Sequence, residues 1–293
     1  MTNRNAHRRS TLAVSAIAAI AAITMSMATP AAAADHPIFA NVPTEAHIAT
    51  QTHAATQTHA ATQTHLATQA TAASPAAKPY TVVPAARKDK WWTKDHANLL
   101  WRAQQGGVDT LFLGDSITAG MNTQLMHKIF GAGAVNFGIP GDGTQHLLWR
   151  MQHGELNFKG TPPTRVIILI GTNHMGSTPL SASERHDVYL GVKADVQEVR
   201  AKLPKASILV LGILPREASP QNFIRGQIDD VNRQISTLAD NQHVWYADIG
   251  SAMLEPDGSL LRTTMSDLLH PTHQIGYTRM FNAIKPYWSA LPH

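Results

Sequence analysis

The sequence predicts an α/β protein in which a mostly parallel sheet is covered by helices on both faces. Short and almost continuously apolar runs recur along the rear of the chain, and segments of helical character lie between them. Such runs are typical of buried parallel strands, and strand–helix alternation is typical of βαβ units. The strand candidates are Val108–Leu113, Ala134–Phe137, Val166–Ile170, Ile208–Leu214 and Val244–Ile249.

Three segments among or after these strands carry helix signals. Ser181–Leu203 has Glu184 and Asp187 in its early turns and basic residues at its end, which suits the helix dipole. Gln221–Ala239 and Ile275–Trp288 are the other two helix candidates. Folds of this class place their sites beyond the carboxyl ends of the strands, so the segments that follow each strand are where we expect functional residues.

The charge distribution divides the chain into an almost uncharged front and a more ordinary rear. Charged residues make up 15% of the sequence, below the roughly 25% of typical globular chains. Of the 24 basic and 20 acidic side chains, six lie in residues 1–85 and the other 38 in residues 86–293. The absence of cysteine excludes disulfide scaffolds, cysteine-ligated metals and thiol nucleophiles. A net charge of +4 gives no support to a nucleic-acid-binding function.

Residues 1–34 have the pattern of a secretory signal peptide, with predicted cleavage after Ala34. Three arginines open the chain, and an apolar run over residues 11–27 and a group of small residues follow. Arg8-Arg9 also permits a twin-arginine signal, and an uncleaved anchor is a further alternative, although the alanine-rich run is short for a membrane span. Removal of the three arginines would lower the net charge from +4 to +1. We therefore expect an exported protein, periplasmic or extracellular, without stable membrane insertion.

Residues 35–87 are predicted to be a disordered linker. Between His47 and Gln69 the chain repeats a six-residue Ala-Thr-Gln-Thr-His-Ala unit, with leucine ending the third copy. This composition lacks the aromatic and branched residues that bury surface. The histidines of the tract could bind metal weakly, but a solvated spacer is favoured because no fixed geometry supports them. The folded domain is accordingly predicted over residues 88–293.

Polar residues and glycines follow the first three strand candidates. Ser116 lies at the turn from a buried strand into a helix, where N–H groups of the helix can stabilise developing negative charge. Asn173 follows the third strand, and its amide can donate to an oxyanion. A helix-capping serine and a turn-forming asparagine are the alternatives. The turn after the second strand includes Gly141, and glycine lets the backbone approach a ligand closely.

A histidine near the carboxyl terminus is the candidate general base. Asp267 precedes His270 by three residues, a spacing at which the carboxylate can reach Nδ1 of that histidine. The aspartate would then fix the tautomer and stabilise the imidazolium, leaving Nε2 free to take the proton of Ser116. His174 and His273 are the alternative bases, and His273 lacks an aspartate at the same offset.

Four blocks in this order resemble the SGNH, or GDSL-type, hydrolase superfamily: Gly114-Asp115-Ser116, Gly141-Asp142, Gly171-Thr172-Asn173 and Asp267-x-x-His270. The segments 136–150, 154–156 and 211–216 resemble more closely one branch, the catalytic subunits of platelet-activating factor acetylhydrolase Ib. The resemblance extends from about Trp91 to about Trp288. It implies a three-layer α/β/α sandwich with a five-stranded parallel sheet, and a carboxylic ester hydrolase.

Matching positions in the resemblance imply the role of each site residue. Ser116 would be the nucleophile, His270 the base and Asp267 its orienting group. The oxyanion hole would consist of the Ser116 N–H, the Gly141 N–H and the Asn173 amide. The acyl pocket of that branch would be formed here by Ile117, Thr172 and Leu269, which implies a short acyl group such as acetyl.

Two positions depart from the pattern of that branch, since Pro140 replaces a glycine and Gly143 a threonine. We expect the loop that contains them to differ in shape. No metal or organic cofactor is implied. The expected partner is a small-molecule or polysaccharide ester, and relatives suggest a homodimer without locating its surface.

Two other functions remain open on the sequence. The same triad in an O-acyltransferase would pass the acyl group to a glycan hydroxyl instead of water. A glycan-binding module without turnover is less favoured, because such a module has no need of Ser116, Asp267, His270 and Asn173 together.

Overall fold

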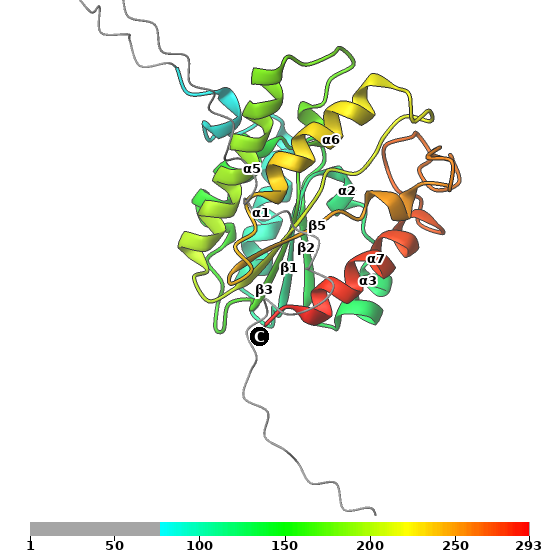
Figure 1. Ribbon diagram of the computed structural model, residues 1–293. Coiled ribbons are helices and arrows are strands. Elements are labelled where there is room, and N and C mark those ends of the chain that lie inside the picture. Colours follow the sequence, from blue (N-terminus) through cyan, green and yellow to red (C-terminus); the bar gives the residue numbers. More distant parts are fainter. Residues whose placement is uncertain (1–76, 293) are drawn as a thin grey trace, which may run out of the picture. The chain divides into compact units, whose positions relative to one another are not determined.

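The computed structural model describes residues 77–292, which form an α/β fold around a five-stranded parallel sheet (Figure 1). The predicted signal peptide and most of the predicted linker lie in residues 1–76, outside the described part of the chain. The strands lie in the order β2-β1-β3-β4-β5, and every neighbouring pair is parallel. They are β1 (Thr110–Gly114), β2 (Ala134–Gly138), β3 (Arg165–Leu169), β4 (Ser207–Leu211) and β5 (Val244–Ala247).

The five predicted strands are therefore confirmed, with small differences at their ends. The predicted segments Ile208–Leu214 and Val244–Ile249 both run too far. The pairing of β4 with β5 stops at Leu211 and Ala247, because the chain then leaves the sheet. The apolar residues beyond these points, Ile213, Leu214 and Ile249, are also buried in the two cores, so hydrophobicity alone does not show where each strand ends.

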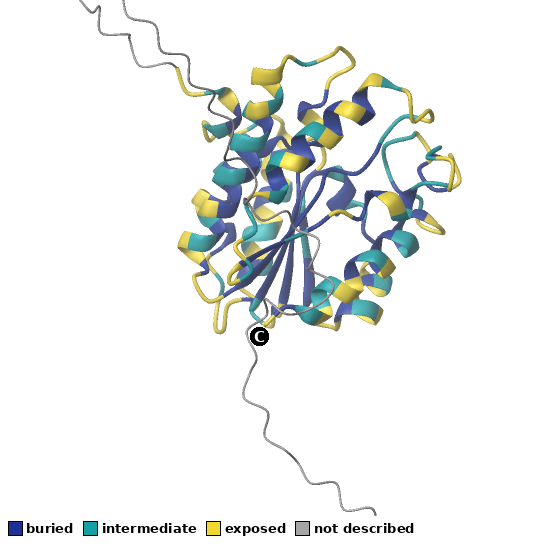
Figure 2. Ribbon diagram, in the orientation of Figure 1, coloured by how far each residue is buried: buried dark blue, intermediate teal, exposed yellow. Residues whose placement is uncertain are grey.

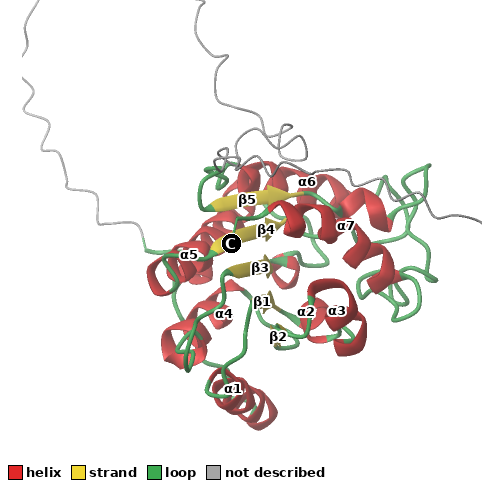
Figure 3. Ribbon diagram, turned by 90° about the horizontal axis from the view of Figure 1, so that it is seen from below, coloured by secondary structure: helices red, strands yellow, loops and turns green. Residues whose placement is uncertain are grey.

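Side chains alternate along each strand and fill two separate apolar cores. Leu111 and Leu113 join the core under α1, α4, α5 and α6, whereas Phe112 joins the core under α3 and α7. Figure 3 shows α1, α4 and α5 on one side of the sheet and α2, α3 and α7 on the other. Figure 2 shows the strands buried and the exposed residues on the outer surfaces of the helices. The helices are α1 (Lys90–Ala103), α2 (Ser116–Ala119), α3 (Thr123–Phe130), α4 (Thr144–Arg150), α5 (Ala182–Lys202), α6 (Phe223–Ser236) and α7 (Gly276–Ala290).

The three predicted long helices correspond to α5, α6 and α7. Ser181 caps α5, accepting from the Glu184 N–H at 3.2 Å while the Glu184 carboxylate accepts from the Ser181 N–H at 2.7 Å. This reciprocal capping box satisfies two N–H groups at the helix start. Across residues 77–292, no helix combines the length and the apolar character that a membrane crossing requires.

Residues 77–89, here called the N-terminal strap, pack against the domain. The predicted linker boundary at residue 87 is therefore too late. Thr81 is buried, its hydroxyl donates to the Asp187 carbonyl at 2.6 Å, and its own carbonyl accepts from the Thr144 hydroxyl at 2.8 Å. The Ala85 N–H donates to the Gln145 carbonyl at 3.0 Å. Backbone hydrogen bonds of this kind are not visible in composition, which explains the error.

The candidate site lies at a change of direction in the sheet. From β1 the chain passes to β2 on one side of β1, and from β2 it crosses to β3 on the other side of β1. In open α/β sheets, sites lie beyond the carboxyl ends of the strands at such a change of direction. Ser116 follows β1, Gly141 follows β2 and Asn173 follows β3, so the topology alone brings these three residues to one edge of the sheet.

Candidate active site

Ser116 begins α2 directly after β1 and is partly exposed. Asp115 caps this short helix, since its Oδ1 accepts from the Ile117 N–H at 2.9 Å. The turn requires glycine at position 114, because an added Cβ would lie 2.2 Å from the Thr118 hydroxyl and 2.3 Å from the Leu169 carbonyl. The local sequence thus presents the serine hydroxyl at a helix N-terminus.

The structure brings Ser116, His270 and Asp267 into one hydrogen-bonded chain. The Ser116 hydroxyl lies 2.8 Å from His270 Nε2, and His270 Nδ1 lies 2.6 Å from Asp267 Oδ2. The predicted pairing of the aspartate with the histidine three residues later is therefore present. This arrangement can remove a proton from the serine hydroxyl and stabilise the resulting imidazolium.

The loop that carries His270 has an unusual backbone. Leu268 adopts φ +64, a region that residues other than glycine seldom occupy. Its N–H donates to the Met265 carbonyl at 2.9 Å, and its carbonyl accepts from the Glu217 N–H at 3.0 Å. These bonds hold the turn that places the aspartate beneath the imidazole. The spacing pattern predicted the contact but not this left-handed residue.

Asp267 is held in its ionised form. Partial burial would raise its pKa, but the His270 N–H, the His270 ring and the Leu269 N–H all donate to the carboxylate, and they lower the pKa to about 2. The two backbone bonds measure 2.7 Å and 3.1 Å. The carboxylate can therefore orient the histidine across the whole neutral and mildly acidic range.

Three candidate oxyanion donors come from three loops at this edge. The Ser116 N–H lies at the start of α2, Gly141 adopts φ +75, and the Asn173 amide donates to the Asp142 carbonyl at 2.8 Å. An amide nitrogen carries two hydrogens, so one remains for a ligand. The bond to Asp142 ties Asn173 to the Gly141 loop.

The residues assigned by resemblance to an acyl pocket differ in exposure. Ile117 is 1% exposed and Thr172 is 3% exposed, whereas Leu269 is half-buried. Ile117 packs into the core beneath α3 and α7, and its carbonyl accepts from the Tyr277 hydroxyl at 2.8 Å. Two of the three side chains therefore belong to the rigid framework next to Ser116 and Asn173.

The alternative bases have other contacts. His174 Nε2 accepts from the Thr144 N–H at 2.9 Å, and its Nδ1 lies 3.0 Å from the Tyr80 hydroxyl. Burial lowers the pKa of His174 to about 4, so it caps α4 as a neutral ring. His273 stacks on Tyr277, with ring centroids 5.5 Å apart. Within the described structure, His270 is the histidine that contacts the serine hydroxyl.

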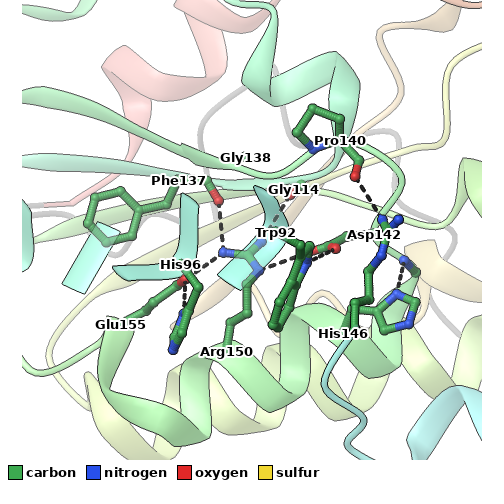
Figure 4. Close-up of polar contacts among 12 residues, drawn as sticks. Trp92, His96, Gly114, Phe137, Gly138, Pro140, Asp142, His146, Arg150 and Glu155 are labelled. Carbon is green, nitrogen blue, oxygen red and sulfur yellow. Dashed lines mark hydrogen bonds and ion pairs between the residues drawn. The ribbon is translucent and has the colours of Figure 1, made fainter. Parts of the chain in front are cut away.

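A buried ionic cluster, which sequence patterns did not predict, lies behind the Gly141 loop (Figure 4). Arg150 is fully buried and forms ion pairs with Asp142, at 2.7 Å, and with Glu155. The Trp92 indole donates to Asp142 at 2.7 Å, and His96 Nδ1 lies 2.8 Å from Glu155. Among residues 77–292, no group of three or more histidine and acidic side chains is arranged to hold a metal ion.

Asp115 gives the site a pH-dependent contribution to stability. Burial, with a smaller effect from the charge of Asp142, raises the pKa of Asp115 to about 7 despite the Ile117 N–H. Between about pH 4 and pH 7, Asp115 is therefore protonated in the folded protein and ionised in the unfolded chain. The stability that Asp115 contributes is greatest below this range and is lost as the pH rises through it. Asp115→Asn keeps the capping oxygen but cannot ionise. Its free energy of unfolding minus that of wild type should therefore increase by a few kcal/mol, roughly, as the pH rises from 4 to 7.

Urea unfolding at several pH values measures this difference for Asp115→Asn. The control is Asp257→Asn on an exposed loop, where hydrogen bonds from the Ser259 hydroxyl and N–H lower the aspartate pKa. Its difference from wild type should stay flat between pH 4 and 7. An equally flat difference for Asp115→Asn would contradict the raised pKa.

Comparison with known proteins places this geometry in a family. The GDSL-like Lipase/Acylhydrolase family matches residues 112–277. The human platelet-activating factor acetylhydrolase IB subunit alpha1 is 34% identical over 214 residues, which cover 72% of this chain and 88% of that protein. The rat alpha2 subunit is 32% identical and covers 68% of this chain and 84% of its own length.

Solved structures agree with this placement. A structure from Streptococcus pneumonia described as a platelet activating factor is 25% identical, with a TM-score of 0.54 over 68% of this chain and 94% of that chain. An acylhydrolase structure from Bacteroides fragilis shares the fold, with a TM-score of 0.54 over 69% of this chain and 98% of that chain at 20% identity. The chain belongs to the GDSL-like lipase/acylhydrolase family and is an ester-hydrolysing enzyme.

Proposed function

We propose that this enzyme is an exported serine esterase that hydrolyses short-chain esters, acetyl esters above all, with Ser116, His270 and Asp267 as its catalytic triad. The observation that carries the proposal is the continuous hydrogen-bonded chain from the Ser116 hydroxyl through His270 to Asp267. Export rests on the pattern of residues 1–34, and a homodimer remains a prediction from relatives.

The proposed reaction proceeds through an acyl-enzyme. Ser116 Oγ attacks the ester carbonyl while His270 Nε2 takes its proton, and His270 then protonates the leaving alcohol as the carbon–oxygen bond breaks. Water attacks the acyl-serine in the second half, with His270 again removing the proton and returning it to Ser116. Asp267 stays ionised in both halves and stabilises the imidazolium.

The oxyanion of each tetrahedral intermediate would lie among the N–H groups of Ser116 and Gly141 and the Asn173 amide. Donors fixed before the reaction stabilise developing charge without reorganisation. The bond between Asn173 and the Asp142 carbonyl, and the capping of α2 by Asp115, support such fixed positions.

Acyl size is the property that tests the acetyl preference. Ile117 and Thr172 are buried beside the proposed site, and side chains held in the core cannot easily move aside for a long acyl chain, which supports a short acyl group. The relatives named acetylhydrolases agree with this proposal. We expect kcat/KM for p-nitrophenyl acetate to exceed that for the octanoate by at least about tenfold, since a misfit of several methylenes is worth roughly 1–3 kcal/mol or more.

The same p-nitrophenyl esters, with the butyrate added, can be compared in Leu269→Ala. Among the three residues assigned to the acyl pocket, Leu269 is the half-buried one and can be shortened without opening the core. The ratio of kcat/KM for the butyrate to kcat/KM for the acetate should be higher in this variant than in wild type. Preference of the wild-type enzyme for octanoate would leave the triad intact and overturn the acetyl proposal.

A further inference from the structure

We propose that Arg87, in the N-terminal strap, is a positioning residue that fixes the direction of the Gly141 N–H in the oxyanion hole. The inference rests on the proposed function and adds to it a residue outside the segment matched by the family, residues 112–277. The juxtaposition that carries it is a hydrogen bond from Arg87 Nη1 to the Pro140 carbonyl, at 2.9 Å.

The geometry of one peptide group links Arg87 to Gly141. The Pro140 carbonyl and the Gly141 N–H belong to the same peptide unit, which is planar and trans. In such a unit the C=O and N–H bonds point in opposite directions. A donor that holds the carbonyl on one side therefore sets the direction in which the N–H points on the other side.

The orientation of this peptide group is set by two torsions, ψ of Pro140 and φ of Gly141. The proline ring fixes φ of Pro140 but neither of these two, and glycine resists rotation less than any other residue. Gly141 adopts φ +75, a conformation that a side chain would oppose. The hydrogen bond from Arg87 supplies a restraint that the glycine does not provide.

The neighbouring residue is already restrained from the other side. The Asp142 carboxylate accepts from Arg150 and Trp92, and its carbonyl accepts from the Asn173 amide. Arg87 therefore completes a clamp in which the residues before and after Gly141 are both held. Figure 4 shows the hydrogen bond accepted by the Pro140 carbonyl and those accepted by the Asp142 carboxylate.

Arg87 is itself held in place although its side chain is partly exposed. Its Nε donates to Asp89 at 3.0 Å, and its guanidinium lies 4.9 Å from the centroid of the Trp91 ring. The guanidinium also covers the turn closely, since a Cβ built on Gly141 would lie 2.7 Å from Arg87 Nη1. An arginine with three such contacts loses less freedom per hydrogen bond than a free surface side chain.

The charge of Arg87 adds to its positioning effect. Burial and then the charge of Arg87 lower the pKa of His146 to about 4, and His146 Nδ1 accepts from the Gly143 N–H at 3.0 Å. The positive potential of the guanidinium therefore reaches this loop, with the sign that favours an oxyanion. A hydrogen bond on the carbonyl also polarises the same peptide group and strengthens its N–H as a donor.

The test uses the full-length chain with Arg87→Met, Arg87→Lys and a matched control, Arg200→Met. Arg200 Nη1 also donates to a proline carbonyl, that of Pro204, at 3.1 Å, but it lies in the last turn of α5, just before β4 begins, and therefore near the amino ends of the strands, away from Ser116. Arg87→Met should lower kcat for p-nitrophenyl acetate by about tenfold with KM within about twofold, a part of the 10²–10³ expected when a donor is removed outright. Arg87→Lys, which retains a donor, should recover part of that loss, and Arg200→Met should match wild type.

Inhibition by phenylboronic acid separates positioning from folding. Its tetrahedral adduct with a serine places an oxygen in the oxyanion hole, so its Ki should rise in Arg87→Met in parallel with the fall in kcat/KM. A smaller fraction of folded enzyme would lower apparent kcat and leave Ki unchanged. Unchanged kcat in Arg87→Met, or a loss of kcat with Ki as in wild type, overturns the inference.

Ser116→Ala in the same assay distinguishes the two proposals. If Ser116→Ala is inactive and Arg87→Met behaves as Arg200→Met does, the inference on Arg87 fails and the proposed function stands. If Ser116→Ala turns over as well as wild type, the proposed function fails and the inference fails with it.

Discussion

Replacing Ser116 with alanine is expected to lower kcat for p-nitrophenyl acetate by at least about 10⁴-fold, since loss of the nucleophile leaves the residual catalysis of the oxyanion hole and of binding. The hydroxyl lies 2.8 Å from His270 Nε2 and is partly exposed, so its removal deletes the attacking atom without opening the core. The free energy of unfolding should change by less than about 0.5 kcal/mol, as for most substitutions away from buried contacts. Stopped assays of hydrolysis together with urea unfolding measure both quantities.

Two further measurements make this prediction specific to Ser116. Ser251→Ala, at an exposed serine in the 3-10 turn Gly250–Met253, should retain wild-type turnover. A fluorophosphonate should add its mass to a peptide that contains Ser116 in the wild-type enzyme and not in the variant. Wild-type turnover by Ser116→Ala, or labelling elsewhere in the chain, would remove the serine from the mechanism.

The parts of the site that the sequence predicted share one property. Ser116, Gly141 and Asn173 each follow a strand whose apolar run is easy to recognise, and parallel topology brings such strand ends together. Asp267 and His270 are three residues apart, so their contact is local. The proximity of these residues could therefore be predicted because their positions follow from strand order or from short spacing, whereas their catalytic roles remain proposals.

The parts that were missed depend on contacts between distant segments or on unusual backbone. Arg87 meets Pro140 and Trp92 meets Asp142 across more than a strand and a helix of intervening chain, with no periodic signal. Helices α1, α3 and α4 were not predicted individually, and α3 and α4 have only eight and seven residues, too few for a clear helical period. The turn after α4 depends on Gly154 at φ +104, which no alternation of residues shows. Pattern arguments cannot supply such long-range geometry.

Loss of Arg150 should destabilise this fold strongly. Its guanidinium is fully buried, pairs with Asp142 and Glu155, and also donates to the carbonyls of Phe137 and Gly114, each at 3.2 Å. Arg150→Met would leave two buried carboxylates without their counterion and two strand-end carbonyls without this donor. Removing one partner of a buried ion pair typically costs about 3–5 kcal/mol, so we expect a loss of that size in urea unfolding.

A surface ion pair provides the matched control for Arg150→Met. Arg279 Nη1 pairs with Glu255 at 3.0 Å, and both side chains are about one third exposed. Arg279→Met should cost less than about 1 kcal/mol, since solvent screens such pairs. Equal costs for the two variants would show that burial of the Arg150 cluster does not set its contribution.

Removal of the stranded charges should restore part of the stability lost in Arg150→Met. The penalty arises from buried carboxylates rather than from a missing attraction alone, so adding Asp142→Asn and Glu155→Gln should make the variant more stable than Arg150→Met by itself.

The stability loss in Arg150→Met should also depend on pH, because the same buried carboxylates titrate. Burial raises the pKa of Asp142 even in the presence of Arg150, whose charge lowers it, so loss of Arg150 should raise that pKa further.

A carboxyl whose folded pKa exceeds its unfolded value takes up a proton on folding, and its contribution to stability increases as the pH falls. The difference between wild type and Arg150→Met should therefore shrink from pH 8 to pH 5, and the triple variant should lose this dependence. A difference that grows toward acid would mean that Asp142 is not the group left unpaired. The Asp142 carbonyl also accepts a hydrogen bond from the Asn173 amide, so Arg150→Met should lose turnover along with stability. This contact connects the buried cluster to the proposed oxyanion hole.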